Sequence, residues 1–224
     1  MSATNEVVEK SLIVHEICRT IQGESSYVGL PCVLVRLAGC AQSCRYCDTP
    51  QARAFDAGKP MTIAQIVGEV EALDCPLVEI TGGEPLAQPA CAQLACCLIE
   101  RGFQVLIETS GSYPIDVLPL QVVKIMDIKC PSSGECERND FSNIERLSSL
   151  DEVKFVIADR RDYEWAREVV CERRLAERCE VLFSPVFGRL EPRRLAEWVL
   201  ADRLRVRLQI QMHKYIWGPE AKGV

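Results

Sequence analysis

The stretch "GCAQSCRYCDTP" at residues 39–50 holds three cysteines within eight residues, Cys40, Cys44 and Cys47. Their spacing is C-x3-C-x2-C, and no fourth cysteine lies close by in the chain. Four thiolates would close a structural zinc site, and two would form a disulfide or a redox pair. Three therefore predict a metal centre in which one coordination position stays open for a ligand.

Two kinds of metal centre fit this pattern. Loop cysteines at this spacing can bind three irons of a cubane iron–sulfur cluster and leave the fourth iron free. The alternative is a zinc site completed by a remote residue such as His15, His213 or Cys130. The spacing favours the cluster.

The composition is that of an ordinary globular protein, with 224 residues of which 48% are hydrophobic and 26% charged. We expect a single domain over residues 1–224, with a loose terminus at residues 1–10. No apolar run reaches the length of a membrane span, and the N-terminal stretch lacks the apolar core of a signal peptide. We therefore expect a cytoplasmic protein without a membrane partner.

Charge and cysteine content exclude two further classes. A formal net charge of −6 argues against broad nucleic-acid binding, which needs a basic surface. The 13 cysteines are odd in number and are not spaced like a disulfide framework. In a reducing compartment such cysteines are metal ligands or small buried hydrophobes, so we expect Cys96, Cys97 and Cys171 in the core.

Apolar runs alternate with segments of helical periodicity along the chain. Strands buried on both faces are predicted at residues 11–17, 32–38, 76–80, 103–108, 122–128, 152–158, 179–183 and 206–211. Helices are predicted after Thr62, which has capping-box spacing with Gln65, and at residues 89–102, 162–175 and 191–202. The alternation predicts an α/β fold with a mainly parallel sheet.

The connection between the strands at 103–108 and 122–128 contains Pro114 and Pro119 and is too short for a crossover helix. A complete eight-fold barrel takes about 250 residues. We therefore predict a shortened, open (β/α) partial TIM barrel. Polar stretches follow the C-terminal ends of its strands, where barrel enzymes place their active sites. They lie at residues 22–24, 39–49, 81–85, 108–111, 127–133, 183–185 and 211–215.

The stretch "CAQSCRYC" resembles the cluster motif CxxxCxxC of the radical S-adenosylmethionine superfamily, in which an aromatic residue commonly precedes the last cysteine. The resemblance implies a [4Fe–4S] cluster on Cys40, Cys44 and Cys47, whose open iron binds S-adenosylmethionine. Reductive cleavage of the cofactor then yields a 5′-deoxyadenosyl radical that abstracts hydrogen. "TGGEP" at residues 81–85 resembles the GGEP motif of the same superfamily, which offers close backbone approach and a carboxylate for the cofactor's ammonium group.

The flanking stretches resemble the 7-carboxy-7-deazaguanine synthase family within this superfamily. They are "TIQGESSYVGLPCVLVRLAGC" at 20–40, "YCDTP" at 46–50, "ETSG" at 108–111, "DIKCPSS" at 127–133 and "QMHKYIWG" at 211–218. The resemblance implies a carbon–nitrogen lyase that converts 6-carboxy-5,6,7,8-tetrahydropterin to 7-carboxy-7-deazaguanine with loss of ammonia. This reaction leads to queuosine and related deazapurines, and it begins with hydrogen abstraction from C6 of the pterin.

Individual residues match positions of that family. Thr49 matches a hydroxyl ligand of Mg²⁺, although taken alone it would be an ordinary helix cap. Arg36 interrupts an apolar strand and is unfavourable to bury unless it meets an anion such as the pterin carboxylate. The resemblance assigns the substrate to Ile21, Gln22, Gly23, Glu24, Arg36, Thr81 and His213, with His213 closing the site from the last strand. It assigns S-adenosylmethionine to Gly83, Glu84, Ser110, Lys129, Ser132, Ser133, Phe183, Ser184, Pro185 and Val186.

The resemblance also implies two protein partners, a flavodoxin-like electron donor and a second copy of the chain. A homodimer is expected because a shortened barrel leaves an edge and apolar surface to be covered. Two other functions stay open. A radical S-adenosylmethionine activase shares the cluster motif but needs a groove for a polypeptide. A zinc-binding interaction module explains three cysteines but leaves "TGGEP", "ETSG" and "DIKCPSS" without a purpose.

Overall fold

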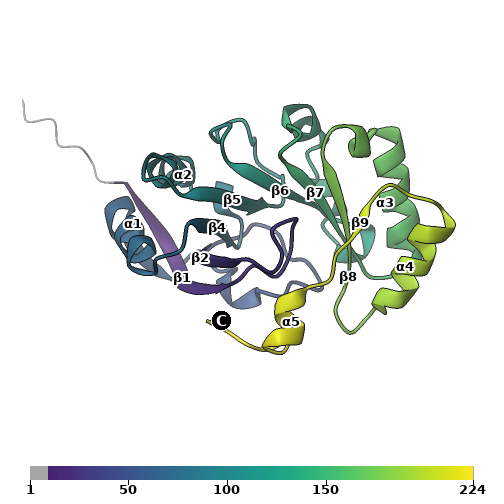
Figure 1. Ribbon diagram of the computed structural model, residues 1–224, viewed down its shortest axis with the longest axis horizontal. Helices are drawn as coiled ribbons and strands as arrows, with labels where there is room; N and C mark the ends of the chain where they lie inside the picture. Colours follow the sequence, from purple (N-terminus) through teal and green to yellow (C-terminus); the bar gives the residue numbers. More distant parts are fainter. Residues whose placement is uncertain (1–9, 224) are drawn as a thin grey trace, which may run out of the picture.

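The computed structural model in Figure 1 describes residues 10–223 of the chain, so the loose terminus expected at residues 1–10 falls almost wholly outside it. Within the described residues one sheet has the strand order β3–β1–β2–β4–β5–β6–β7–β8–β9. Its strands are β1 (Ser11–Ile21), β2 (Pro31–Leu37), β3 (Lys59–Thr62), β4 (Leu77–Gly82), β5 (Gln104–Thr109), β6 (Val123–Ile128), β7 (Glu152–Ile157), β8 (Glu180–Pro185) and β9 (Arg207–Leu208).

The helices are α1 (Ile63–Ala72), α2 (Cys91–Glu100), α3 (Arg160–Glu172), α4 (Pro192–Ala201) and α5 (Met212–Ile216). Short 3₁₀ turns are η1 (Pro50–Ala52), η2 (Pro85–Ala87), η3 (Pro131–Ser133), η4 (Cys136–Arg138), η5 (Phe141–Arg146) and η6 (Leu175–Glu177). The capping box predicted at the start of α1 is confirmed, because Thr62 and Gln65 each accept a hydrogen bond from the other's backbone. Pro192 is the first residue of α4, where its missing N–H is harmless.

The sheet is mixed and open. β1 pairs antiparallel with β2 and with β3. Every pair from β2–β4 to β8–β9 is parallel. β3 and β9 end the strand order without pairing with each other. The predicted shortened, open partial barrel is therefore confirmed.

At the ends of the sheet, one predicted strand is shorter than expected and one strand was not predicted. The strand predicted at 206–211 pairs only at Arg207–Leu208, because the backbone leaves β8 after Gln209 and turns into α5. β3 has no predicted counterpart, because four residues that include Pro60 show no strand pattern. It is an edge strand that pairs with the first part of β1, a position at which proline is tolerated.

Helices cover the outer face of the sheet in two pairs, at opposite ends of the molecule (Figure 1). Ile66 of α1 and Leu94 of α2 belong to a buried cluster with β1, β2, β4 and β5. Tyr163 of α3 and Leu195 of α4 belong to a second cluster with β6, β7 and β8. These two clusters supply the main apolar burial of the fold.

The inner face of the sheet changes character along its strands. A small apolar cluster on this face contains Leu77 of β4, Leu106 of β5 and Ile125 of β6. Side chains two residues apart in a strand point to the same face. The inner-face positions that follow are therefore Glu79, Glu108 and Asp127, all charged. The concave side of the sheet is thus apolar near the strand starts and ionisable near the strand ends.

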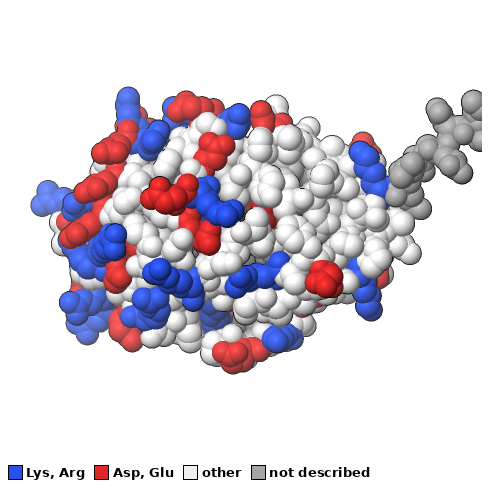
Figure 2. Space-filling model, turned by 180° about the vertical axis from the view of Figure 1, so that it is seen from behind, with Lys and Arg blue, Asp and Glu red and all other residues white. Residues whose placement is uncertain are grey.

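The back surface of the molecule carries charges of both signs. Figure 2 shows Lys and Arg interspersed with Asp and Glu, most densely at the end that carries α3 and α4. Exposed apolar side chains include Leu120, Leu150 and Leu200. Among the helices of the described residues, none is long and apolar enough to cross a membrane.

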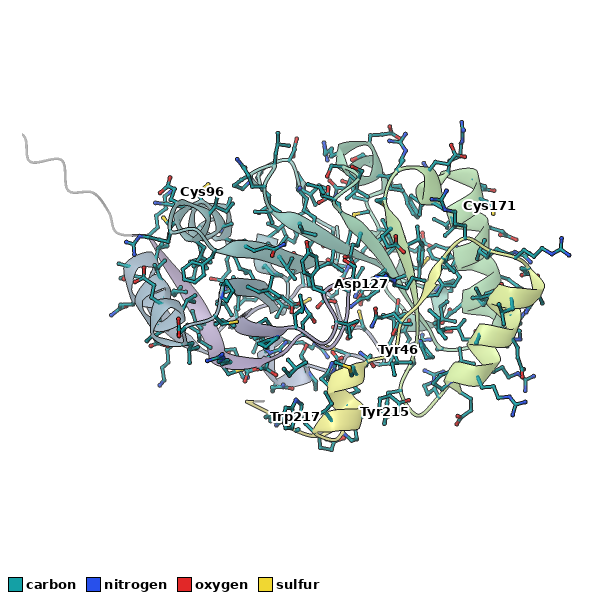
Figure 3. All side chains as sticks on the ribbon, viewed as in Figure 1. Tyr46, Cys96, Asp127, Cys171, Tyr215 and Trp217 are labelled. Carbon is teal, nitrogen blue, oxygen red and sulfur yellow. The ribbon has the colours of Figure 1, made fainter. Side chains whose placement is uncertain are left out.

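The expectation that Cys96, Cys97 and Cys171 are all core residues is wrong. Cys96 and Cys171 are exposed, and Cys97 is half-buried against the outer core. Neighbouring helix residues point about 100° apart, so the Cys96–Cys97 pair cannot face the core together. Figure 3 shows Cys96 on α2 and Cys171 on α3, far from Asp127 at the centre of the molecule.

Candidate active site

A cavity of about 600 Å³ lies between the inner face of the sheet, the three-cysteine stretch and the C-terminal segment. Cys40, Cys44 and Cys47 line it together with inner-face residues of β2, β4, β5, β6 and β7. Tyr46 and Asp127 lie centrally in Figure 3, and α5 with Tyr215 and Trp217 lies to one side. Motifs that are far apart in the sequence therefore meet in one cavity.

The cysteine loop, residues 39–49, is held by backbone hydrogen bonds. Gly39 N donates to Ala52 O at 2.8 Å, and Cys40 N donates to Arg53 O at 2.9 Å. Arg45 N donates to Ser133 O at 2.9 Å, which ties the loop to η3. Tyr46 Oη donates to Val156 O of β7 at 3.1 Å. The loop thus rests on the ends of several strands, which fixes where the thiols point.

The three thiols are not gathered around the position of one zinc ion. One zinc ion with bonds of 2.3 Å to sulfur would bring tetrahedral thiolates to about 3.8 Å of one another. Within residues 10–223, Cys40, Cys44 and Cys47 do not form a set whose sulfur atoms all lie within 4.8 Å of one another. A cubane cluster binds each thiolate through a different iron and needs the wider spacing. The arrangement of the three sulfur atoms therefore disfavours a single zinc ion and is compatible with a cluster.

Thr49 lies two residues after Cys47, at the start of η1. As the residue before this turn it makes no side-chain cap, so the ordinary capping role is excluded. Its Oγ1 lies 3.9 Å from Cys47 Sγ, and the residue lines the cavity. The hydroxyl is therefore available to a hard cation next to the thiols.

The stretch "TGGEP" packs against the cysteine loop. Gly83 N donates to Leu37 O at 2.9 Å, and Glu84 N donates to Gly39 O at 2.7 Å. A Cβ on Gly83 would overlap the backbone of Gly39, so only glycine permits this approach. Glu84 is buried and accepts hydrogen bonds from Leu86 N, Thr109 Oγ1 and Ser110. The motif joins two loops as well as lining the site.

The stretch at residues 22–24 reaches the cavity from an unexpected end. β1 is antiparallel, so Ile21 lies beside Pro31 at the start of β2, and the expectation that this stretch joins the C-terminal strand ends is wrong. Gln22 instead crosses the inner face and donates to Glu79 in the middle of β4. Its Oε1 accepts from Glu24 N at 2.9 Å.

His213 lies in α5, and not on the last strand as expected. The helix is docked by Met212 N, which donates to Gly23 O at 2.9 Å. A Cβ on Gly23 would overlap the His213 ring, so the glycine admits the imidazole. Burial lowers the pKa of His213, and this outweighs the negative charges of Glu24 and Asp48, which raise it. A neutral imidazole therefore closes this side of the cavity at neutral pH.

Arg36 lines the cavity but is not an isolated cation. Its Nε lies 2.6 Å from Glu16 Oε1 of β1, and both side chains are mostly buried. This bond uses one of the five guanidinium N–H donors and leaves the others for a ligand. Glu16 therefore already supplies Arg36 with an anion, and the expectation that Arg36 needs a bound anion is only partly right.

A buried lysine, Lys154 of β7, organises the ionisable inner face. Its Nζ lies 2.7 Å from Glu24 Oε2, contacts Glu108, and lies 3.8 Å from Asp127 Oδ2. Burial opposes the charge on Lys154, but these carboxylates hold its pKa well above the ordinary value. Lys129 pairs separately with Asp127 at 2.9 Å. The inner face thus carries more carboxylates than cations.

Glu24, Asp48 and His213 bring one ligand atom each within 4.8 Å of one another. The Glu24 oxygens accept from Lys154 and Gln211. Asp48 Oδ2 accepts from Gln211 at 3.0 Å and lies 3.2 Å from Lys214 Nζ. Because cations and amides already bond to these oxygens, we assign no metal to this set.

The structure brings most of the residues predicted from the sequence into one cavity, but not all. Those that line it are Ile21, Gln22, Gly23, Glu24, Arg36, Cys40, Cys44, Cys47, Thr49, Thr81, Gly83, Ser110, Lys129, Val186 and His213. Those that do not line it are Glu84, Ser132, Ser133, Phe183, Ser184 and Pro185. Ser132 bonds to Asp159 and Asp162 at the start of α3, and Ser133 Oγ donates to Cys130 O. These two serines support the loops around the cavity.

Glu79 and Lys154 are cavity residues that no predicted stretch contains, and Glu108 and Asp127 begin predicted stretches but had no individual role. Each is a charged residue inside a mainly apolar strand, which is the signal that singled out Arg36. A buried charge needs a partner or a ligand wherever it occurs. A search for charge in every strand identifies all four, but it also identifies Lys124 and Glu152, which do not line the cavity.

Comparison with known proteins gives the same picture. Residues 34–121 match the Radical SAM superfamily. A relative named 7-carboxy-7-deazaguanine synthase from Chlorobaculum tepidum is 48% identical, over 96% of this chain and 99% of the relative. One of the same name from Koribacter versatilis is 45% identical, over 94% and 99%. Among solved structures, QueE from Escherichia coli matches with a TM-score of 0.76 at 22% identity, over 91% of this chain and 95% of that one, which supports the fold.

Proposed function

The chain belongs to the 7-carboxy-7-deazaguanine synthase family of radical S-adenosylmethionine enzymes, and we propose that its cavity converts 6-carboxy-5,6,7,8-tetrahydropterin to 7-carboxy-7-deazaguanine with release of ammonia. It is a lyase of the queuosine pathway that uses a [4Fe–4S] cluster and S-adenosylmethionine. The observation that carries the proposal is the meeting of three cysteine thiols with a polar, ionisable inner face in one cavity. Membership of this family argues against both alternatives, the activase and the zinc-binding interaction module.

The residues of the cysteine loop have the first task. Cys40, Cys44 and Cys47 would hold the cluster, and Gly83 and Ser110 line the space next to them, where the cofactor would lie. When bound, the cluster and S-adenosylmethionine supply the radical that removes hydrogen from the substrate. The remaining work of the chain is to position the substrate and to exclude competing reactions.

The inner face has the second task, which is to orient the pterin. Glu24 is kept ionised, because Lys154 outweighs the effect of burial and lowers the pKa of its carboxyl. It can accept from the N–H groups of the pterin's guanine-like edge, next to Thr81. The free N–H groups of Arg36 can donate to the pterin carboxylate. Neutral His213 closes the site from α5.

Thr49 would be a ligand of Mg²⁺, with the pterin carboxylate as a second ligand. Its hydroxyl makes no cap and faces the cavity beside Cys47. Magnesium prefers hard oxygen ligands and keeps several waters, so one hydroxyl and one carboxylate suffice. The cation would then fix the substrate carboxylate with respect to the cysteine loop.

The assembly is proposed to be a cytoplasmic homodimer of single-domain subunits, reduced by a flavodoxin-like donor and without a nucleic-acid or membrane partner. The open sheet and the exposure of Leu120 (83%) and Leu200 (76%) support a covered apolar surface. Light scattering should report a dimer at micromolar concentration. A particle of 25.1 kDa, the mass of one chain, would refute it.

Turnover tests the proposed function. Anaerobically reconstituted protein, S-adenosylmethionine, Mg²⁺ and a reductant should convert the carboxytetrahydropterin to a product with the mass of 7-carboxy-7-deazaguanine. Cys44→Ala should lose both the brown cluster and the product, whereas Cys96→Ala, at an exposed cysteine of α2, should lose neither. Product from Cys44→Ala, or a reconstituted parent that leaves the pterin unchanged, would contradict the proposal.

A further inference from the structure

Glu79 is a buried carboxyl group without a cation. It lies in the middle of β4 on the inner face, lines the cavity and is 6% exposed. Its Oε2 accepts from Gln22 Nε2, and no described residue donates to its Oε1. Within residues 10–223 it forms no ion pair, although three neighbouring carboxylates share Lys154. A buried carboxyl bonded only to an amide is far more stable neutral than ionised.

The charged groups around Glu79 also favour its neutral form. Burial raises its pKa to about 8, helped by Glu108 of β5 and by Glu24. The opposing cations are Lys154 of β7 and Arg36 of β2, and both already pair with other carboxylates. Cys32 on β2 stays a neutral thiol, since burial raises its pKa to about 12. The surroundings of Glu79 on every side therefore leave its proton in place at neutral pH.

Two carboxyl groups of the cavity thus have opposite states. Glu24 is ionised beside Lys154 and accepts hydrogen bonds only, whereas a protonated Glu79 can donate one. Gln22 donates to the Glu79 carboxyl and accepts from the backbone N–H of Glu24, which ties the two residues together. Sites that drive two carboxyls to different states use them for different roles.

We infer that Glu79 carries a proton at neutral pH and is a specificity-determining residue, whose O–H donates to a carbonyl oxygen or ring nitrogen on the guanine-like edge of the pterin. Ionised Glu24 accepts from the N–H groups of the same edge. Protonated Glu79 and ionised Glu24 together offer one donor and one acceptor, which match the acceptor and the donors that lie side by side on the guanine-like edge of the pterin. The proton on Glu79 is a property of the protein alone, and only the identity of the ligand atom rests on the proposed function.

The proton is tested by infrared spectroscopy of the reconstituted protein without substrate. The parent at pH 7 should show the carbonyl band of a protonated carboxylic acid, and the band should disappear in Glu79→Gln. The band should persist in Glu108→Gln and in Glu69→Gln, a matched change at an exposed position of α1. A parent without the band, or a band that disappears only in Glu108→Gln, would overturn the inference.

The role in specificity is tested by anaerobic binding of the carboxytetrahydropterin without reductant, so that no turnover occurs. The parent Kd should rise about fivefold between pH 8 and pH 9 as the donor is lost. Glu79→Gln keeps an N–H donor that does not ionise, so its Kd should lack this rise. Glu79→Met has no donor and should bind about tenfold more weakly at pH 7.

Unfolding temperatures show whether either variant is simply destabilised, and Glu79→Gln binding as tightly as the parent at pH 7 shows an intact site. Identical pH profiles for the parent and Glu79→Gln would overturn the ligand contact and leave the infrared result standing. Absence of pterin binding at every pH would overturn both the ligand contact and the proposed function. Even then, the infrared band of the protonated carboxylic acid would still show that Glu79 carries the proton.

Discussion

Lys154 Nζ lies 2.7 Å from Glu24 Oε2, which joins the middle of β7 to the segment that follows β1. The same ammonium group contacts Glu108 of β5 and is 3% exposed. One buried cation therefore connects three parts of the chain that are distant in sequence, and it balances carboxylates that would otherwise repel one another. The arrangement determines both the shape and the charge of the cavity.

Lys154→Met should lower the free energy of unfolding by about 3 kcal/mol, because it leaves buried carboxylates without their partner. Those carboxylates must then take up protons to remain buried, so their folded-state pKa values rise. Stability of the variant is consequently lost as pH rises, and the deficit should be larger at pH 8 than at pH 6. Urea unfolding at the two pH values measures it. Lys59→Met, at an exposed residue of β3, is the control, and an equal deficit at both pH values would contradict the explanation.

Gly23→Ala should displace His213 and with it α5, because the new Cβ overlaps the imidazole ring. A shift of about 1 Å in a positioning group reduces turnover by about 10²-fold, so kcat/KM should fall by that order. Gly68→Ala is the matched control in α1, where an added Cβ meets nothing within 4 Å. It should retain activity and gain about 0.5–1 kcal/mol of stability. Unchanged kinetics in Gly23→Ala would show that α5 does not need this contact.

Thr49→Ala should weaken the stimulation of turnover by Mg²⁺ and leave the iron and sulfide content unchanged, because it removes a hydroxyl that makes no structural cap. Thr49→Ser keeps the hydroxyl and should keep the response. Steady-state rates over a range of Mg²⁺ concentrations, with parallel iron analysis, separate the two effects. Equal stimulation in Thr49→Ala and the parent would argue against a ligand role.

The fold was open to prediction because its strands are mainly apolar runs and its helices carry local start signals such as Thr62 with Gln65. The direction of β1 could not be predicted, because nothing local in residues 11–21 distinguishes an antiparallel partner from a parallel one. That single unknown put residues 22–24 at the wrong end of the sheet.

The residues of the site likewise fall into two groups, those fixed by local spacing and those fixed by contacts that are distant in sequence. The cysteine loop could be predicted because its ligands lie within eight residues, where spacing alone limits the geometry. His213 and Glu79 depend on contacts with Gly23 and Gln22, far away in sequence. Pairings of that kind are set by tertiary packing, which the local pattern does not encode. Buried charge inside apolar strands was the usable signal for the rest.

The measurement that bears most directly on the proposed chemistry follows a deuterium atom placed at C6 of the carboxytetrahydropterin. Reconstituted protein is turned over anaerobically with S-adenosylmethionine and a reductant, and the nucleoside and pterin pools are analysed by mass. Abstraction at C6 predicts that deuterium enters 5′-deoxyadenosine and S-adenosylmethionine while 7-carboxy-7-deazaguanine accumulates. Product formation in which the label never leaves the pterin would contradict hydrogen abstraction at that carbon.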